Sequence, residues 1–468
     1  MGDTSSEQGR SNIGSFLSML GRGLDDNVLV TDPDLLKRYS SDWSGKDITP
    51  PVAVVRPRDT RELSVLIGRC HDANWPVVVQ GGLTGLCGGA TPRPGELAVS
   101  LERLKQIEEI DTASGYMTVA AGATLASIHE AAAKHQLMFA LDLASRGTCT
   151  IGGNIATNAG GNRVLRYGTT RQHVLGLEVV LADGRVLSSM KSILKDNAGY
   201  DLKQLFIGSE GTLGIVTRAV LRLHHAPPQR MSALVALDSY DDLLALLAAL
   251  QAGAGVALSS FEVMWSNYVE CVLSTLPIAR PFSRLWPYYA LLEFEVSDSL
   301  SDREGVEAAL SRQIGAGCIG DAVIAKSMVE EAALWRIREA AGELVARFDP
   351  AATFDVSMPL SMMPGFVDQI EARCTAMLSR APVCAFGHLG DGNLHLLIPL
   401  ASRAAGPEVD SIVYGALNGA GSVSAEHGIG VAKKSWLGVT RSAAEIDVMR
   451  GLKAHFDPRG ILNPGRVI

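Results

Sequence analysis

Residues 388–395 read His388-Leu389-Gly390-Asp391-Gly392-Asn393-Leu394-His395, and the rest of the chain is organised around this stretch. An Asp-Gly pair between apolar runs is typical of a two-residue hairpin turn of type I′, because both central residues of that turn need a positive φ. Counting outward from the turn places His388 opposite His395. Directly opposed side chains on one sheet face have Cβ atoms about 4.5–5.5 Å apart, which lets two imidazoles bind one metal ion. The stretch therefore predicts a hairpin that carries two metal-binding histidines.

A second segment, Ser424-Ala425-Glu426-His427-Gly428, supplies the remaining ligand type. Two histidines and the carboxylate of Glu426 leave coordination positions open, which is typical of a catalytic rather than a structural metal site. His427, next to that ligand, is a candidate proton acceptor because imidazole titrates near neutral pH. The alternative is a pair of structural histidines that flank a turn. The Asp-Gly symmetry, the Glu-His pair and the surrounding glycines favour a metal ion. Zinc is the first candidate and manganese the alternative, because a site of two histidines and a carboxylate accepts several divalent ions.

The composition describes a soluble globular protein with several domains. The 468 residues are 47% hydrophobic and 20% charged, and domains average about 100–200 residues. A net charge of −8 and a pI near 5.7 argue against nucleic acid as a partner. The 7 cysteines form no Cys-x-x-Cys pair, which favours reduced thiols in the cytoplasm. A polar start and the lack of a long apolar run predict neither a signal peptide nor a membrane span.

Glycine-rich loops dominate the first half of the chain. A β–α–β pattern starts at Val52–Val55, continues through a helix capped by Asp59, with Glu62 closing a capping box, and ends at Val77–Val79. The turn that follows, 80–89, offers backbone N–H groups to an anion such as a pyrophosphate, although a tight turn of no function is the alternative. The segment 147–161 is too rich in glycine for a helix interior and would let an extended cofactor lie against the main chain.

The second half predicts an α+β or α/β domain in which strands alternate with amphipathic helices. Further strands are expected at Val174–Leu181 and Val216–Leu223, before Pro227-Pro228 ends the first domain. The later elements are strands at 231–237, 258–263, 288–296, 354–356, 383–386 and 394–399, and helices near 240–251, 303–314, 328–347, 408–418 and 443–456. Residues 315–320 fit G-x-G-x-x-G, but they follow a helix and are expected to be its exit, which argues against NAD as the cofactor.

Several of these segments together resemble the FAD-linked oxidases of the vanillyl-alcohol oxidase type, in particular the D-2-hydroxyacid dehydrogenases. The residues that carry the resemblance are Ile151–Gly161, Lys195–Gly211, His388–His395, Ser424–Gly430 and Gly460–Pro464. The resemblance implies an α+β fold with a helical lead-in (1–50), an FAD-binding domain of two subdomains (51–227), a cap domain with a large antiparallel sheet (228–420), and a C-terminal helical segment that returns to FAD (421–468).

The resemblance also implies the cofactor and the residues that bind it. The expected FAD-binding residues are Gly81, Gly82, Thr84, Gly85, Gly152, Gly153, Asn154, Thr157, Asn158, Gly161, Glu210, Gly211, Ile215 and Asn463. Some relatives attach FAD covalently through a histidine where this chain has Leu83, so non-covalent FAD is expected. Cys149 stands where some relatives have a second attachment, and without the histidine we expect it to be unused.

The activity that the resemblance implies is oxidation of a D-2-hydroxy acid to the 2-oxo acid. His388, His395 and Glu426 match the metal ligands of the family, and His427 matches its base. A 2-hydroxy acid chelates the metal, which lowers the pKa of its hydroxyl; His427 takes the proton, and hydride passes to flavin N5. Arg338 matches an arginine that binds a substrate carboxylate through its planar fork, and a surface helix arginine is the alternative.

Substrate, acceptor and competing functions remain open from the sequence. Relatives that oxidise dicarboxylates have a lysine just before the strand of Phe354–Val356, where this chain has Thr353. The substrate is therefore expected in the D-2-hydroxyglutarate, D-malate or D-lactate class. The expected electron acceptor is electron-transfer flavoprotein or a quinone, and the expected assembly is a homodimer. The alternative functions are a non-redox alkyl transferase of the same fold and an electron-transfer subunit of a larger oxidase, which would have a degenerate metal site.

Overall fold

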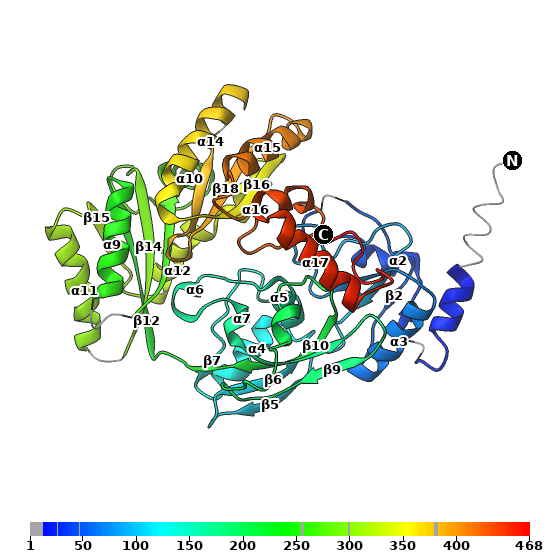
Figure 1. Ribbon diagram of the computed structural model, residues 1–468. Helices are drawn as coiled ribbons and strands as arrows, with labels where there is room; N and C mark the ends of the chain where they lie inside the picture. Colours follow the sequence, from blue (N-terminus) through cyan, green and yellow to red (C-terminus); the bar gives the residue numbers. More distant parts are fainter. Residues whose placement is uncertain (1–12, 26, 46, 254–256, 298–299, 379–381) are drawn as a thin grey trace. The chain divides into compact units, whose positions relative to one another are not determined.

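The computed structural model describes residues 13–468 apart from 26, 46, 254–256, 298–299 and 379–381 (Figure 1). It divides into two compact units, which we describe separately. The first comprises Met1–Ala159, Thr169–His225 and Glu426–Ile468, and the second comprises Gly160–Gly168 and Ala226–Ala425. The expected helical lead-in is helical at 13–20 and continues with short elements, and its residues 1–12 lie outside the described part of the chain. No helix in the described residues combines the length and apolar composition needed to cross a bilayer.

One of the two main sheets of the first unit has four strands in the order β1-β2-β4-β3. Its strands are β1 (Leu29–Val30), β2 (Val54–Val55), β3 (Val77–Gln80) and β4 (Leu97–Ser100). Helix α3 (Thr60–Asp72) connects β2 to β3 and begins where the Asp59 carboxylate accepts the Glu62 N–H, as predicted. The predicted capping box is incomplete, because Glu62 accepts the N–H of Arg58 instead of that of Asp59.

The other main sheet of this unit is antiparallel, in the order β5-β6-β10-β8-β9. Its strands are β5 (Ile107–Asp111), β6 (Tyr116–Ala120), β8 (Val174–Val180), β9 (Val186–Ser189) and β10 (Ile215–Arg222). The predicted strands at 174–181 and 216–223 are confirmed. Both sheets contribute to one apolar core, which contains Leu97 of the first sheet and Leu177 of the second. Burying each such side chain contributes about 1.5–3 kcal/mol, so this core holds the two sheets together.

The segment around Gly152 forms helix α5 (Ile151–Thr157), so the prediction that it is too glycine-rich for a helix is wrong. A Cβ on Gly152 would lie 2.7 Å from the Cβ of Ala121, which shows how closely the helix approaches its neighbour. Glycine costs a helix about 1 kcal/mol relative to alanine, and the close packing offsets that cost here. The helix ends at Asn158, whose φ of 52° is left-handed.

The second unit is built on a seven-stranded sheet in the order β15-β12-β14-β13-β17-β18-β16 (Figure 1). Its strands are β12 (Gln229–Leu237), β13 (Ala257–Trp265), β14 (Tyr288–Val296), β15 (Asp321–Ile324), β16 (Ala351–Ser357), β17 (Cys384–His388) and β18 (Asn393–Pro399). Every pairing within it is antiparallel, which confirms the large antiparallel sheet expected for the cap domain.

Helices follow most of these strands. They are α9 (Tyr240–Ala252), α10 (Ser266–Thr275), α11 (Leu300–Gly315), α12 (Met328–Glu339), α13 (Ala341–Arg347), α14 (Met363–Leu378) and α15 (Gly406–Ala416). The single helix predicted over 328–347 is two helices that meet at Ala340. Helix α11 ends at Gly315, and Gly317 has a φ of +78°, so the G-x-G-x-x-G match is the exit of a helix, as predicted.

The hairpin between β17 and β18 differs from the predicted one. Its loop is Leu389–Gly392, with a 3₁₀ turn over Leu389–Asp391, and His388 pairs with Asn393. The predicted two-residue turn and the direct opposition of His388 and His395 are therefore wrong. Tertiary packing explains the difference: Leu389 is fully buried, and a Cβ on Gly390 would lie 2.9 Å from the side chain of Leu165. Both residues leave the ladder because they pack elsewhere.

Candidate functional site

A cleft in the first unit gathers half of the predicted FAD-binding residues. It is partly open to solvent. The predicted residues that line it are Gly81, Gly152, Gly153, Glu210, Gly211, Ile215 and Asn463. Apolar residues such as Val79, Leu101 and Phe206 form the rest of the wall. A lining of glycines and apolar side chains suits a large and partly apolar ligand.

Glycines let the loop after β3 pack against the start of α5. A Cβ on Gly81 would lie 2.5 Å from Thr150 Oγ1, and one on Gly82 would lie 2.0 Å from the carbonyl oxygen of Thr148. Thr150 Oγ1 is buried and has no hydrogen-bond partner within the described residues. Buried hydroxyls are nearly always bonded, so this one points to a missing polar group. A glycine-rich turn beside a buried hydroxyl without a partner fits the pyrophosphate end of FAD.

The other predicted FAD residues do not line this cleft. They are Gly82, Thr84, Gly85, Asn154, Thr157, Asn158 and Gly161, of which Gly161 belongs to the second unit. Asn158 accepts bonds from the Arg171 N–H at 2.9 Å and the Thr169 hydroxyl at 3.1 Å, and the Thr157 hydroxyl donates to the carbonyl of Gly153. These side chains stabilise the segment that carries the cleft glycines.

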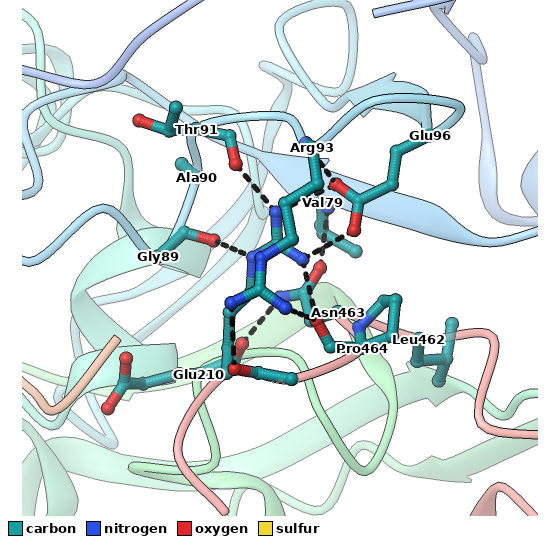
Figure 2. A network of polar contacts seen from close by, with 12 residues as sticks. Val79, Gly89, Ala90, Thr91, Arg93, Glu96, Glu210, Leu462, Asn463 and Pro464 are labelled. Carbon is teal, nitrogen blue, oxygen red and sulfur yellow. Dashed lines mark hydrogen bonds and ion pairs between the residues drawn. The ribbon is translucent and has the colours of Figure 1, made fainter. Parts of the chain in front are cut away.

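The C-terminal segment reaches the cleft through Asn463, which lines it. Asn463 lies between β3 and Glu210 (Figure 2): its Oδ1 accepts the Val79 N–H at 2.8 Å, and its Nδ2 donates to the Glu210 carbonyl at 2.6 Å. Leu462 pairs with Val77 in a parallel bridge, so the segment extends the four-stranded sheet. The return of the C-terminal segment to FAD and the role of Asn463 toward FAD both stay predictions.

Arg466 was missed by the sequence analysis, because nothing in its local sequence distinguishes it from a surface arginine. Its side chain is fully buried and forms an ion pair with Glu96 at 2.7 Å. It also donates to the carbonyl oxygens of Gly89 and Thr91 at 2.9 and 2.6 Å. Arg466 thereby holds the far end of the glycine-rich turn that begins at Gly81.

A row of ionisable side chains crosses one face of the seven-stranded sheet in the second unit. Cross-strand pairs connect Glu262 with His388, Phe386 with His395, and His395 with Asp355. Paired residues and residues two apart share a face, so the row lies on one face of the sheet. The register differs from the predicted one by two residues, which returns both histidines to the same face. Their ring centroids are 5.4 Å apart, so the two histidines come together as diagonal neighbours.

Glu262 joins two of the predicted site residues. Its carboxylate accepts a bond from His388 Nδ1 at 2.8 Å and one from the Arg338 guanidinium at 2.8 Å. Burial alone would raise the pKa of Glu262, but the charges of His388 and Arg338 outweigh it and lower the pKa below its ordinary value. The ionised carboxylate orients the His388 ring through Nδ1. An Arg338 Nη lies 3.5 Å from His388 Nε2, so these two predicted functional groups lie side by side.

Three placements on this face bear on the sequence-based expectations. Arg338 is 7% exposed, so the alternative of a surface helix arginine is wrong. Asp355 is buried, and its carboxylate lies 3.9 Å from His395 Nδ1. The sequence analysis missed Glu262 and Asp355, although an acid within an apolar strand was an available signal. Thr353 lies inside β16 opposite Leu397 rather than before the strand, and it is exposed.

Glu426 and His427 start the C-terminal part of the first unit, directly after Ala425 of the second. Within the second unit, the Ala425 N–H donates to the carbonyl of Asp355 at 3.4 Å, and the Ser424 hydroxyl donates to the Asp355 carboxylate at 3.3 Å. Ala425 is thereby held against β16, the strand that pairs with His395. The role of Glu426 as the third ligand stays a prediction.

Comparisons with known proteins cover nearly the whole chain. Residues 226–467 match the family described as FAD linked oxidases, C-terminal domain, and residues 51–189 match the family described as FAD binding domain. A D-2-hydroxyglutarate dehydrogenase of Xanthomonas citri is 41% identical over 447 residues, which are 94% of each chain. The mitochondrial D-2-hydroxyglutarate dehydrogenase of Bos taurus is 37% identical over 94% of this chain and 81% of its own length.

Solved structures show the same fold at low sequence identity. An alkyldihydroxyacetonephosphate synthase superposes with a TM-score of 0.74 at 17% identity, over 96% of this chain and 84% of that one. A 4-ethylphenol oxidase from Gulosibacter chungangensis also superposes with a TM-score of 0.74, at 18% identity, over 100% of this chain and 98% of that one. At such identities the likeness concerns the fold alone.

Proposed function

Because this chain belongs to the FAD-linked oxidase family, as one of its FAD-dependent D-2-hydroxyacid dehydrogenases, we propose that it oxidises a small D-2-hydroxy acid with one divalent metal ion. The observation that carries the proposal is the cluster of Arg338, Glu262 and His388, with His395 beside it, on one face of the sheet. It joins a carboxylate-binding group to a pair of metal-binding imidazoles. D-2-hydroxyglutarate is the first candidate substrate, because relatives at 34–41% identity carry that name.

Arg338 would bind a carboxylate of the substrate. Its Nε and one Nη are engaged by Glu262, which fixes the plane of the guanidinium and leaves the remaining N–H groups for an anion. A buried guanidinium fixed in this way loses little side-chain entropy when the substrate arrives. Arg338 would therefore select a substrate with a carboxylate and orient that carboxylate with respect to His388.

His388, His395 and Glu426 would hold the metal ion, zinc first and manganese as the alternative. Two imidazoles and one carboxylate suit a divalent ion with open positions, and such an ion would lower the pKa of the bound substrate hydroxyl. Glu262 supports His388 through Nδ1, as carboxylates commonly support metal-binding histidines. His427 would then take the hydroxyl proton.

The cleft residues Gly81, Gly152, Gly153, Glu210, Gly211, Ile215 and Asn463 would hold FAD without a covalent bond. Bound FAD supplies, at its N5 atom, the acceptor for the hydride that leaves C2 of the substrate. Leu83 offers no nucleophile for covalent attachment, and the Cys149 thiol is buried, with a pKa that desolvation raises. A thiol that stays protonated is a poor nucleophile, which agrees with non-covalent FAD.

An anaerobic panel of D- and L-2-hydroxy acids tests the proposal. Flavin absorbance should bleach with D acids and not with L acids; a chelator should stop the bleaching, and zinc or manganese should restore it. His388→Ala should abolish metal-dependent turnover while FAD remains bound. Absence of bleaching with every acid would refute the dehydrogenase and favour the alkyl transferase. Unchanged turnover in His388→Ala would refute the ligand assignment.

The proposal also covers the electron acceptor, the oligomeric state and the cellular location of the protein. Electrons would pass to electron-transfer flavoprotein or a quinone rather than to NAD, because the described chain has no dinucleotide-binding G-x-G-x-x-G in the required strand–turn–helix context. The assembly proposed is a homodimer. The composition favours the cytoplasm, although named relatives are mitochondrial. The alternative of an electron-transfer subunit is disfavoured. That function predicts a degenerate metal site, whereas His388, His395 and Glu426 are all present in this sequence.

A further inference from the structure

Glu210 has a backbone conformation that is uncommon for a residue with a side chain. Its φ is +50°, and the next residue, Gly211, has a φ of +70°. Non-glycine residues are uncommon in this region, and glycine would adopt it freely. The main chain of Glu210 is bonded on both sides, because its N–H donates to the Ala156 carbonyl at 2.8 Å and its carbonyl accepts from Asn463 (Figure 2). The backbone of Glu210 is therefore part of the cleft wall.

The carboxylate of Glu210 binds a different part of the same unit. One oxygen accepts the N–H of Ile429 at 2.6 Å, and the other accepts the N–H of Gly430 at 2.8 Å. Hydrogen bonds from backbone N–H groups to a carboxylate are shorter and stronger than neutral ones. Both bonded N–H groups come directly after His427-Gly428, so the carboxylate holds the turn that follows the imidazole.

This turn has little intrinsic preference for one shape. Gly428 and Gly430 have φ values of +79° and +52°, and a run of glycines has many accessible conformations. A Cβ on Gly428 would lie 2.8 Å from Glu210 Oε1, so the carboxylate fits directly against the glycine. On the far side, the carbonyl of Cys87 accepts the N–H groups of Val431 and Ala432 at 2.9 and 3.0 Å. The turn is clamped between two loops of the FAD-binding unit.

We propose that Glu210 is a positioning residue for His427, and that it ties the place of this imidazole to the wall of the flavin cleft. The inference rests on the proposed role of His427 as the base. The sequence predicted only that Glu210 lines the FAD site. In this proposal the backbone of Glu210 shapes the cleft, and its carboxylate orders the turn that follows His427.

Glu210→Gln tests the inference without changing the volume of the side chain. Glutamine keeps one acceptor and places an NH₂ group against the second N–H, and Glu210→Ala removes both acceptors. Hydrogen exchange of a peptide spanning 426–432, measured with FAD bound, should accelerate roughly tenfold to hundredfold in both variants. At saturating FAD, kcat should fall on the order of 10²-fold, because small displacements of a catalytic group have effects of this size. KM and the Kd of FAD should stay within about threefold, since the backbone bonds of Glu210 remain.

Glu178→Gln is the matched control. Glu178, in β8, is a buried carboxylate of the same unit that accepts bonds from Thr60 at 2.7 Å and from Thr217 at 3.0 Å. This variant should lose stability and keep the wild-type kcat and the wild-type exchange of 426–432. Equal losses of kcat in both glutamine variants would mark a general structural effect and overturn the inference.

Four further outcomes separate this inference from the proposed function. If Glu210→Gln keeps the wild-type kcat or the wild-type hydrogen exchange, the positioning role is overturned. The bonds to the Cys87 carbonyl would then be sufficient to order the turn. A loss of kcat that disappears at saturating FAD overturns it as well, because it marks a cofactor-binding role alone. Wild-type turnover in His427→Gln refutes both the proposed role of His427 as the base and any role in catalysis of the turn that follows it. An inactive His427→Gln beside a fully active Glu210→Gln refutes only the positioning role.

Discussion

Replacing Glu262 by glutamine should weaken both the stability of the second unit and the affinity for a divalent metal. The carboxylate bonds Arg338 and His388 at 2.8 Å each, and the side chains of Glu262 and Arg338 are 1% and 9% exposed. Glutamine keeps the shape but carries no charge, so Arg338 loses its buried counter-charge. Removing one partner of a buried ion pair costs about 3–5 kcal/mol, and we expect the free energy of unfolding to fall by that amount.

Metal affinity should fall as well, because the variant no longer orients His388. Loss of a carboxylate that supports a metal-binding histidine typically costs about 10–100-fold in affinity. Competition with a chelator measures this affinity in the FAD-loaded protein, and urea unfolding measures stability. The matched control is Glu293→Gln, because Glu293 is a buried carboxylate of the same sheet that pairs with Arg163 at 3.2 Å. The control should lose stability and keep metal affinity.

The pH dependence checks the same reasoning independently. His388 and Arg338 lower the pKa of Glu262 against the effect of burial, so the folded pKa lies below the unfolded value of about 4.3. The stabilisation is therefore present above about pH 4.3 and disappears as the pH falls through the lower folded pKa. The stability gap between wild type and Glu262→Gln should close in that acid window. A gap that does not change with pH, or a variant that binds metal like the wild type, would refute the reasoning.

Three more changes have distinct expected outcomes. Gly152→Ala places a Cβ within 2.7 Å of its neighbour, so it should lower the free energy of unfolding by about 1–3 kcal/mol and weaken FAD binding. Gly342→Ala, in a helix with open space around the glycine, should raise the free energy of unfolding by about 0.5–1 kcal/mol. Similar unfolding curves for the two variants would contradict this. Arg466→Met breaks the buried pair with Glu96 and should cost about 3–5 kcal/mol and lower FAD affinity in a fluorescence titration, so wild-type affinity would disprove the role of this arginine in shaping the turn. Burial raises the pKa of the Cys70 thiol from 9.0 to about 12, so the unfolded chain releases its proton first and stability should fall by about 1.4 kcal/mol per pH unit between about pH 9 and pH 12. Cys70→Ala should lack this component in urea unfolding at high pH.

Local pattern was sufficient for most elements and for the types of residue at the site. Strands β8 and β10 and helix α17 (Ala443–Phe456) lie where periodicity and capping residues predicted them, because those signals act within a few residues. The Asp-Gly turn marked the hairpin and its histidines for the same reason. Local rules failed at α5 and at the hairpin loop, where the packing of Gly152, Leu389 and Gly390 against distant segments outweighed local preference.

The sequence by itself determined the two imidazoles on adjacent strands of one hairpin. Their shared sheet face was predicted correctly despite the wrong turn, because a pleat of period two preserves the face under a register shift of two. The sequence also determined that glycine-rich loops follow the strands of the first unit. Only the tertiary structure decided which partners these groups meet. Glu262 is far from His388 in sequence, Glu96 is far from Arg466, and Glu210 is far from Ile429. Such pairs depend on strand register and on the close approach of separate loops, and no local propensity encodes either.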